Sequence, residues 1–280
     1  MPKDRIKVAV AQISSAPGFV EANVAHHLGA IAEARRDGAD LLLFPELSLT
    51  GYLGAPDVDR LALDRDAAQI RRIAEAAGPM AVSLGFIERG PGGRAFNSQI
   101  LLCPDRVDVH RKINLPGYGN LREDRYFAAG DSLDPVVIGG GWRVATTICA
   151  DAWNPALPWI AALRGADILL VPSASARGAV GEDFDNPRGW GINLAHTALT
   201  YAIPVLFANH CVQNAEGDFW GGSRILDADA NVLCDAGPEP RTIFATLDFA
   251  HGAAARARLP TVRDSRPDLV RTLLAQRTDA

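Results

Sequence analysis

The sequence of 280 residues lacks the features that mark membrane proteins and nucleic-acid-binding proteins. No apolar run approaches the roughly 20 residues that a helix needs to cross a bilayer. No large block of lysines and arginines occurs, and the formal net charge is −5. The sequence therefore predicts an acidic, solvated surface, with neither a membrane nor a nucleic acid as partner.

Cysteines at metal-binding or redox spacing are also missing. The four cysteines, Cys103, Cys149, Cys211 and Cys234, are widely spaced and form no Cys-x-x-Cys pair. This spacing predicts no disulfide framework and no structural metal site. The first residues lead directly into the segment Ile6–Gln12, without the longer apolar core of a secretion signal. A reducing, cytoplasmic location is therefore expected.

Hydrophobic periodicity in the rest of the chain predicts strands that alternate with helices and also occur in adjacent pairs. Strands are expected at residues 6–13, 41–44, 80–87, 97–103, 143–148, 167–171, 205–209, 223–227 and 242–247. Helices are expected from residue 20 to the Gly38 stop and at 63–77, 158–164 and 191–201. Long loops are expected at 111–135 and 173–187. This order favours the α/β class with a mixed sheet, in one domain over residues 1–280. Its core would cover about 5–250, and a C-terminal extension about 251–280.

Three polar residues stand where predicted strands end. Glu46 follows the apolar segment Leu41–Pro45, Cys149 follows Val144–Ile148, and Lys112 opens the first long loop. In α/β sheets the carboxyl ends of strands are where ligands bind. Taken singly, each residue has an ordinary alternative: a helix cap or surface charge for Glu46, a surface cation for Lys112, and a core thiol for Cys149.

Together the three residue types form a chemical unit. A thiol needs a base or a positive neighbour to become a nucleophile near neutral pH. A glutamate in a dry pocket can accept that proton and return it, and a lysine ammonium can stabilise the oxyanion formed at an amide carbonyl. A Cys-His design is less favoured because no histidine has a recognisable protease context. The histidines are His26, His27, His110, His196, His210 and His251.

Longer segments around these residues resemble a known family. The segments Phe44–Tyr52, Arg111–Pro116 and Ile148–Trp153 are similar to the Glu, Lys and Cys motifs of the nitrilase, or carbon–nitrogen hydrolase, superfamily. Further similarity lies at Glu123–Phe127 and Phe219–Ser223. The resemblance implies a four-layer α-β-β-α sandwich, and dimers or larger homo-oligomers built on it.

The resemblance also implies roles for individual residues. It makes Glu46, Lys112 and Cys149 a catalytic triad, in which Glu46 is the base and Cys149 the nucleophile. It implies that Glu123 helps to position the substrate and the base. The backbone N–H of Ala150 would join Lys112 in binding the oxyanion. Neither a metal nor an organic cofactor is needed for this chemistry.

Two further patterns indicate a branch of the superfamily. The loop Leu115–Glu123 and the Cys-x-Asp-x-Trp pattern at Cys149–Trp153 resemble the amidase domain of glutamine-dependent NAD synthetases. No P-loop-like ATP motif occurs, so an amidase without ATP chemistry is expected. Nitrilases usually carry Cys-Trp-Glu after the nucleophile, whereas Ala150 and Asp151 stand here, which makes nitriles less favoured substrates.

Substrate choice is expected to depend on the loops around Cys149. Five aromatic residues are candidates for the pocket wall, with core or rim packing as the alternative: Tyr52, Tyr118, Trp153, Phe184 and Trp190. Ser173 stands at a strand end, and Arg177 and Arg188 follow in the next loop. Arginines in such loops hold a substrate carboxylate in carbamoyl-amino-acid hydrolases, for which a guanidinium fork is suited.

The sequence therefore predicts a hydrolase of a small amide or N-carbamoyl compound that works through a Cys thioester. Four alternatives stay open at this point. They are a glutaminase-type subunit that supplies ammonia to a separate synthetase, a nitrilase, an acyltransferase, and a non-catalytic scaffold.

Overall fold

Two six-stranded sheets form the centre of the computed structural model, which describes residues 2–214 and 217–276. The first sheet has the order β14-β1-β2-β3-β4-β5. Its strands are β1 (Arg5–Gln12), β2 (Leu41–Leu43), β3 (Ala81–Arg89), β4 (Ala95–Cys103), β5 (Arg106–Arg111) and β14 (Arg241–Asp248). The second sheet has the order β13-β12-β9-β8-β7-β6. Its strands are β6 (Val136–Val137), β7 (Arg143–Thr146), β8 (Ile168–Pro172), β9 (Val205–Ala208), β12 (Arg224–Leu226) and β13 (Val232–Asp235).

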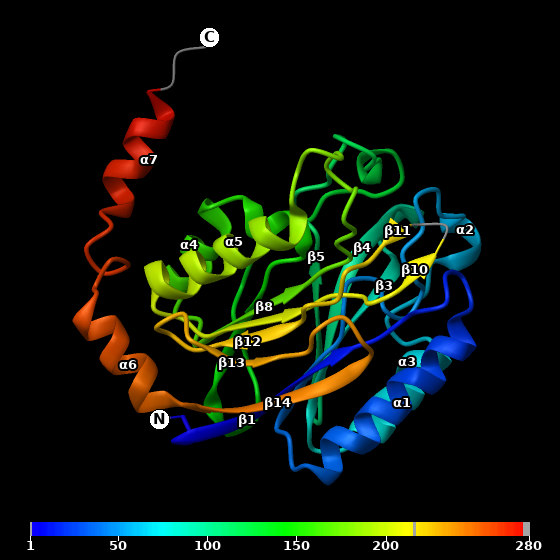
Figure 1. The fold of residues 1–280 in the computed structure, drawn as a ribbon, viewed down its shortest axis with the longest axis horizontal. Coiled ribbons are helices and arrows are strands. Elements are labelled where there is room, and N and C mark those ends of the chain that lie inside the picture. Colours follow the sequence, from blue (N-terminus) through cyan, green and yellow to red (C-terminus); the bar gives the residue numbers. More distant parts are fainter. Residues whose placement is uncertain (1, 215–216, 277–280) are drawn as a thin grey trace.

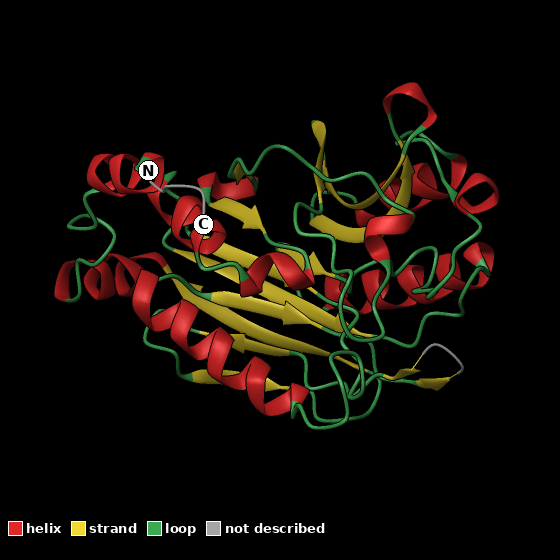
Figure 2. Cartoon of the chain, turned by 90° about the horizontal axis from the view of Figure 1, so that it is seen from above, coloured by secondary structure: helices red, strands yellow, loops and turns green. Residues whose placement is uncertain are grey.

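Helices cover the outer face of each sheet (Figures 1 and 2). Helices α1 (Val20–Arg36) and α3 (Ala68–Ala77) pack on the first sheet, and α4 (Ala156–Leu163) and α5 (Asn186–Tyr201) pack on the second. A third apolar cluster, with members from both sheets, fills the space between them. The predicted four-layer α-β-β-α sandwich is thus confirmed. A short helix α2 (Val58–Leu61) and a hairpin of β10 (Gln213–Asn214) and β11 (Gly217–Asp218) lie outside the layers.

The central strands of both sheets are parallel. β2 pairs in parallel with β1 and β3, and β8 does so with β7 and β9. All three residues of β2 are buried, which accords with a continuous apolar run in a strand covered on both faces. In β1 the side chains of Val8 and Val10 enter the core between the sheets, while Ala9 and Ala11 face the helices. The small alanines let α1 approach the sheet closely.

Two of the differences from the predicted elements lie beside candidate site residues, at Lys112 and at Arg188. Residues 106–111 form β5 along the edge of the first sheet, where periodicity indicated no strand. Their side chains are exposed or half-buried, so the apolar signal is weak. Helix α5 begins at Asn186 instead of residue 191, because the Asp185 side chain accepts from the N–H of Arg188 and caps the helix there.

The C-terminal segment divides into two helices. Helix α6 (Phe249–Arg258) packs on its own chain, where Ala255 is buried with Ala202 and Ala228. Helix α7 (Pro267–Ala275) has no buried residue and stands away from the sandwich (Figure 1). Residues 277–280 of the predicted extension lie outside the described residues. None of the described helices combines the length and apolar character needed to span a bilayer.

Candidate active site

Glu46 lies in a tight turn directly after β2. Leu47 has a φ of 50°, in the left-handed region that is costly for a residue with a branched side chain. The turn rests on Gly85 of β3, where a Cβ atom would lie 2.1 Å from the backbone nitrogen of Leu47. The absence of a side chain at Gly85 therefore lets the Glu46 turn pack against the sheet.

Lys112 is a fully buried cation held between two carboxylates. It follows β5, and its Nζ lies 2.6 Å from Oε1 of Glu46. The same Nζ lies 2.9 Å from Oε1 and 2.7 Å from Oε2 of Glu123. All three side chains are almost completely removed from solvent. Buried charges of this kind are tolerable only when they are paired.

Two further groups orient the carboxylates. The Asn97 side chain on β4 donates through Nδ2 to Glu46 Oε1 at 2.7 Å and to Glu123 Oε2 at 3.3 Å. The backbone N–H of Ala174, just after β8, donates to Glu46 Oε2 at 2.8 Å. Both oxygens of Glu46 are therefore fixed in direction. Sequence reasoning missed both groups, because neither residue type signals a site by itself.

The charge distribution shifts the pKa values of these groups. Burial is the main cause that raises the pKa of Glu123 to about 7; the ammonium of Lys112 opposes the shift and the carboxylate of Glu46 adds to it. Burial also disfavours the charged form of Lys112, but the two carboxylates outweigh it and hold the pKa of Lys112 well above its usual range. The site thus keeps a charged lysine beside a carboxyl that titrates near neutral pH.

Cys149 opens a 3₁₀ turn, Cys149–Trp153, that follows β7. Its φ is 47°, so a second non-glycine residue of the site stands in the left-handed region. Burial, with Glu46 second, raises the pKa of the thiol, while Lys112 and a hydrogen bond from the Ala174 backbone act in the opposite direction. The resting nucleophile is therefore a thiol, and a base must remove its proton during the reaction.

Asp151 ties the Cys149 turn to the segment after Lys112. Its Oδ1 accepts from the backbone N–H groups of Ile113 at 3.1 Å and Asn114 at 2.7 Å. Its Oδ2 accepts from the N–H of Ile148 at 3.1 Å. The carboxylate is fully buried. The sequence contained this residue in a matched motif, but its bonds to residues 37 and 38 positions away became visible only in the structure.

A small cavity of about 30 Å³ lies beside Cys149. Most of the predicted pocket residues line it: Tyr52, Tyr118, Glu123, Ala150, Trp153 and Trp190. Trp190 is 1% exposed and donates to Ser175 Oγ at 2.9 Å, so it is also a core residue. The Tyr52 hydroxyl donates to Glu123 Oε1 at 3.3 Å, which connects the pocket wall to the buried charges.

Four predicted residues lie outside this cavity. The exposed Arg177 pairs with Asp218 at 3.3 Å, and Arg188 is exposed at the start of α5. Neither guanidinium lines the Cys149 cavity, and their role in holding a substrate carboxylate stays a prediction. Ser173 is buried at the end of β8. Phe184 packs edge-on against Trp153, with 6.1 Å between ring centroids, outside the pocket wall.

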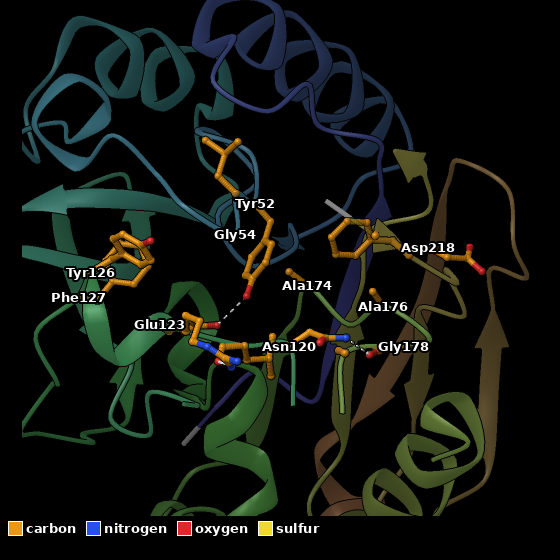
Figure 3. A pocket seen from close by; sticks show the side chains of 16 residues that line it. Tyr52, Gly54, Asn120, Glu123, Tyr126, Phe127, Ala174, Ala176, Gly178 and Asp218 are labelled. Atoms are coloured by element: carbon orange, nitrogen blue, oxygen red, sulfur yellow. Dashed lines mark hydrogen bonds between the residues drawn. The ribbon is translucent and has the colours of Figure 1, made fainter. Parts of the chain in front are cut away.

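A second, larger cavity of about 320 Å³ adjoins the first (Figure 3). The two have five lining residues in common: Tyr52, Leu121, Glu123, Ala174 and Ala179. The larger cavity extends from the Tyr52–Glu123 pair toward the β11 segment, with Asp218 on that side, and Phe219 also lines it. Within residues 2–214 and 217–276, no group of three or more His, Cys, Asp or Glu side chains has an arrangement that could hold a metal ion.

The model of one protein family, described as carbon-nitrogen hydrolase, matches residues 7–257. The chain belongs to the carbon-nitrogen hydrolase family. The matched range includes the turns of Glu46 and Cys149, the segment of Lys112 and the loop of Glu123. The residues that the structure gathers around the small cavity thus all fall within the part shared with this family.

Two named relatives are similar along most of the chain. The glutamine-dependent NAD(+) synthetase of Thermotoga maritima is 30% identical over 239 residues, which cover 82% of this chain and 39% of the synthetase. The chain therefore spans about two fifths of the length of that relative. The citrullinase of Francisella tularensis is 29% identical over 277 residues, which cover 94% of this chain and 96% of the citrullinase.

A solved structure with a similar fold is that of an amidase from Nesterenkonia sp. It has a TM-score of 0.80 and 26% identity, and the match covers 96% of each chain. A variant of that amidase carries the acetamide moiety of fluoroacetamide, covalently added at its active-site cysteine. The neighbour thus has a reactive cysteine in a comparable sandwich.

Proposed function

We propose that this protein hydrolyses a small amide through a thioester on Cys149. The observation that supports this most directly is the buried Lys112 ammonium, shared by Glu46 and Glu123 at 2.6–2.9 Å beside the Cys149 cavity. A scaffold would have no reason to keep three buried charges around a thiol, because their burial costs folding free energy.

The first half-reaction forms the thioester. Glu46 accepts the Sγ proton of Cys149 while sulfur attacks the carbonyl carbon of the amide. The carbonyl π electrons move to oxygen, where the Lys112 ammonium and the backbone N–H of Ala150 stabilise the negative charge. Glu46 then gives its proton to the amide nitrogen, the C–N bond breaks, and ammonia or an amine leaves.

The second half-reaction releases the acid. Glu46 accepts a proton from water, whose oxygen attacks the thioester carbon. The C–S bond breaks and Glu46 returns the proton to Cys149. Glu123, held by Lys112 and Asn97, orients the lysine and closes one wall of the cavity. The net reaction consumes one amide and one water, and forms one acid and one ammonia or amine.

A glutaminase-type activity is the second candidate, because the chain is 30% identical over 239 residues to a glutamine-dependent synthetase. In that case glutamine would be the amide and the ammonia would pass to a separate protein. The similarity to a citrullinase supports N-carbamoyl compounds as a further substrate class for the same site. A homo-oligomer and a cytoplasmic location stay predictions.

An ammonia-release screen tests the proposal. The purified protein should release ammonia from at least one member of a set of simple carboxamides, N-carbamoyl compounds, glutamine and nitriles. Cys149→Ala should abolish this activity, while Cys103→Ala, a half-buried cysteine on β4, should retain it. Intact-mass measurement during turnover should find the acyl mass on the wild-type chain. Full turnover by Cys149→Ala would refute the proposal.

A further inference from the structure

The larger cavity has the size of a ligand site and no assigned occupant. Its volume of about 320 Å³ lies at the lower end of the ~300–1,000 Å³ of small-molecule pockets. The space beside Cys149, about 30 Å³, has room for a head group of a few atoms only. Because the larger cavity has five lining residues in common with this space, we place the rest of a substrate whose amide lies at Cys149 in the larger cavity.

The wall of the larger cavity is largely apolar. Its main apolar side chains are Tyr52, Leu53, Leu121, Tyr126, Phe127 and Phe219. Tyr52 and Phe219 meet edge to face, with ring centroids 6.0 Å apart. Phe127 is buried in the cluster formed with Leu47, so the wall is supported by packed residues behind it. Such a surface favours an apolar ligand group.

The charged side chains at this cavity already have partners. Arg122 donates to two backbone carbonyls of its own loop. Asp218 pairs with Arg177, and Glu123 pairs with Lys112. A charged substrate group would have to displace one of these contacts as it enters a largely apolar space, which is costly.

We propose that the 320 Å³ cavity binds an uncharged, apolar acyl group, and that the substrates are primary amides R–CO–NH₂ with R in this cavity. This inference rests on the proposed function. The amide head occupies the space at Cys149, ammonia is the leaving group, and R remains in the cavity as part of the thioester. Phe219 and Ala176, which both line the cavity, then determine which R is accepted.

A substrate series tests the proposal on the wild-type chain. The value of kcat/KM for ammonia release should rise from acetamide through butanamide to hexanamide, by up to about fourfold per buried methylene. Phenylacetamide should also exceed acetamide. The monoamide of adipic acid, which places a carboxylate at the end of R, should be at least about 100-fold poorer than hexanamide.

Variants of the cavity wall locate the effect. Ala176→Leu fills the cavity without lining the space at Cys149, so it should lower the ratio of kcat/KM for hexanamide to that for acetamide at least about tenfold. Phe219→Ala, the second variant, should reduce the preference for hexanamide over acetamide several-fold. Phe19→Ala, which removes a ring that is 71% exposed, should leave the preference unchanged.

The failure of this inference is distinct from failure of the proposed function. If acetamide and hexanamide were hydrolysed equally well, or the adipic monoamide best, the apolar subsite would be wrong while the Cys149 chemistry stood. Equal effects of Ala176→Leu on acetamide and hexanamide would also overturn the subsite. If wild type released no ammonia from any amide, the proposed function itself would fall.

Discussion

The carboxylate of Asp151 accepts a hydrogen bond of 2.7 Å from the backbone N–H of Asn114, two residues after Lys112. Asp151 itself lies two residues after Cys149. One buried side chain therefore sets the distance between the segment that carries the cation and the turn that carries the thiol. Its other oxygen holds Ile148, directly before Cys149, so the turn is anchored on both sides.

We expect Asp151→Asn to lower kcat by about 100-fold, because small displacements of reacting groups have effects of this size. Asparagine has one acceptor oxygen, and its amide nitrogen would face either the Asn114 or the Ile148 N–H. The free energy of unfolding should also fall by about 1–3 kcal/mol. Steady-state ammonia release and urea unfolding measure the two effects. Asp134→Asn, at an exposed ion pair, is the control; a fully active Asp151→Asn would contradict the anchoring role.

The Asn97 amide lies between the two carboxylates that bind Lys112. Asn97→Asp would place a third negative charge there with no added cation, which favours protonation of the neighbouring carboxyls. Because the pKa of Glu123 is already raised to about 7 and should rise further, we expect the acid limb of the kcat/KM profile to move up by about one pH unit or more. Ser98→Ala, on the opposite face of β4, should not move it. An unchanged limb in Asn97→Asp would show that Asn97 acts on packing alone.

Gly85 should be intolerant of any side chain. In Gly85→Ala the new methyl group would collide with backbone atoms of Leu47 and Glu46. Backbone atoms cannot move aside by a change of side-chain rotamer. We expect a loss of about 1–3 kcal/mol in unfolding free energy, or more, together with reduced activity from a displaced Glu46. Gly29→Ala is the matched control, because nothing lies within 4 Å of its new methyl group. In the interior of α1, Gly29→Ala should raise the free energy of unfolding by about 0.5–1 kcal/mol. Equal melting temperatures for Gly85→Ala and Gly29→Ala would contradict this explanation.

Much of the sandwich could be predicted because its central strands are apolar on both faces. The run Leu41–Leu43 and the segment Ile168–Val171 predict buried strands by composition alone, and polar residues directly after such strands indicate a site. Glu46 and Cys149 were found in this way. Strand β5 was missed because it lies at a sheet edge, where water replaces the neighbouring strand and the apolar pattern disappears.

The remaining parts of the site depend on contacts between distant residues. The bond from Ala174 to Glu46 joins residues 128 positions apart, and it uses a backbone N–H that every residue type except proline offers. The position of an arginine in a loop also does not determine where its side chain points. Arg177 pairs in the structure with Asp218, which comes from the β11 hairpin, and no local pattern predicts the location of this hairpin.

The raised pKa of Glu123 predicts how stability depends on pH. The pKa rises from 4.5 to about 7 on folding, mainly through burial. Between these values the folded chain holds the proton and the unfolded chain has released it. The contribution of Glu123 to stability therefore decreases as pH rises through this window and is constant above about 7. Glu123→Gln removes the titration, so the melting temperature of wild type minus that of the variant should decrease from pH 4.5 to 7.

Glu88 supplies the contrasting case for this measurement. Burial would raise its pKa, but hydrogen bonds from Arg111, Ser98 and Arg65 outweigh it and lower the pKa to about 2. Its contribution to stability is complete above pH 4.5 and is lost as pH falls toward 2. The melting-temperature difference between wild type and Glu88→Gln should therefore be constant from pH 4.5 to 8.5. Over the same range, the difference between wild type and Glu123→Gln should decrease up to about pH 7 and then stay constant. A flat difference for Glu123→Gln as well would show that Glu123 is ionised throughout, and that Lys112 compensates its burial completely.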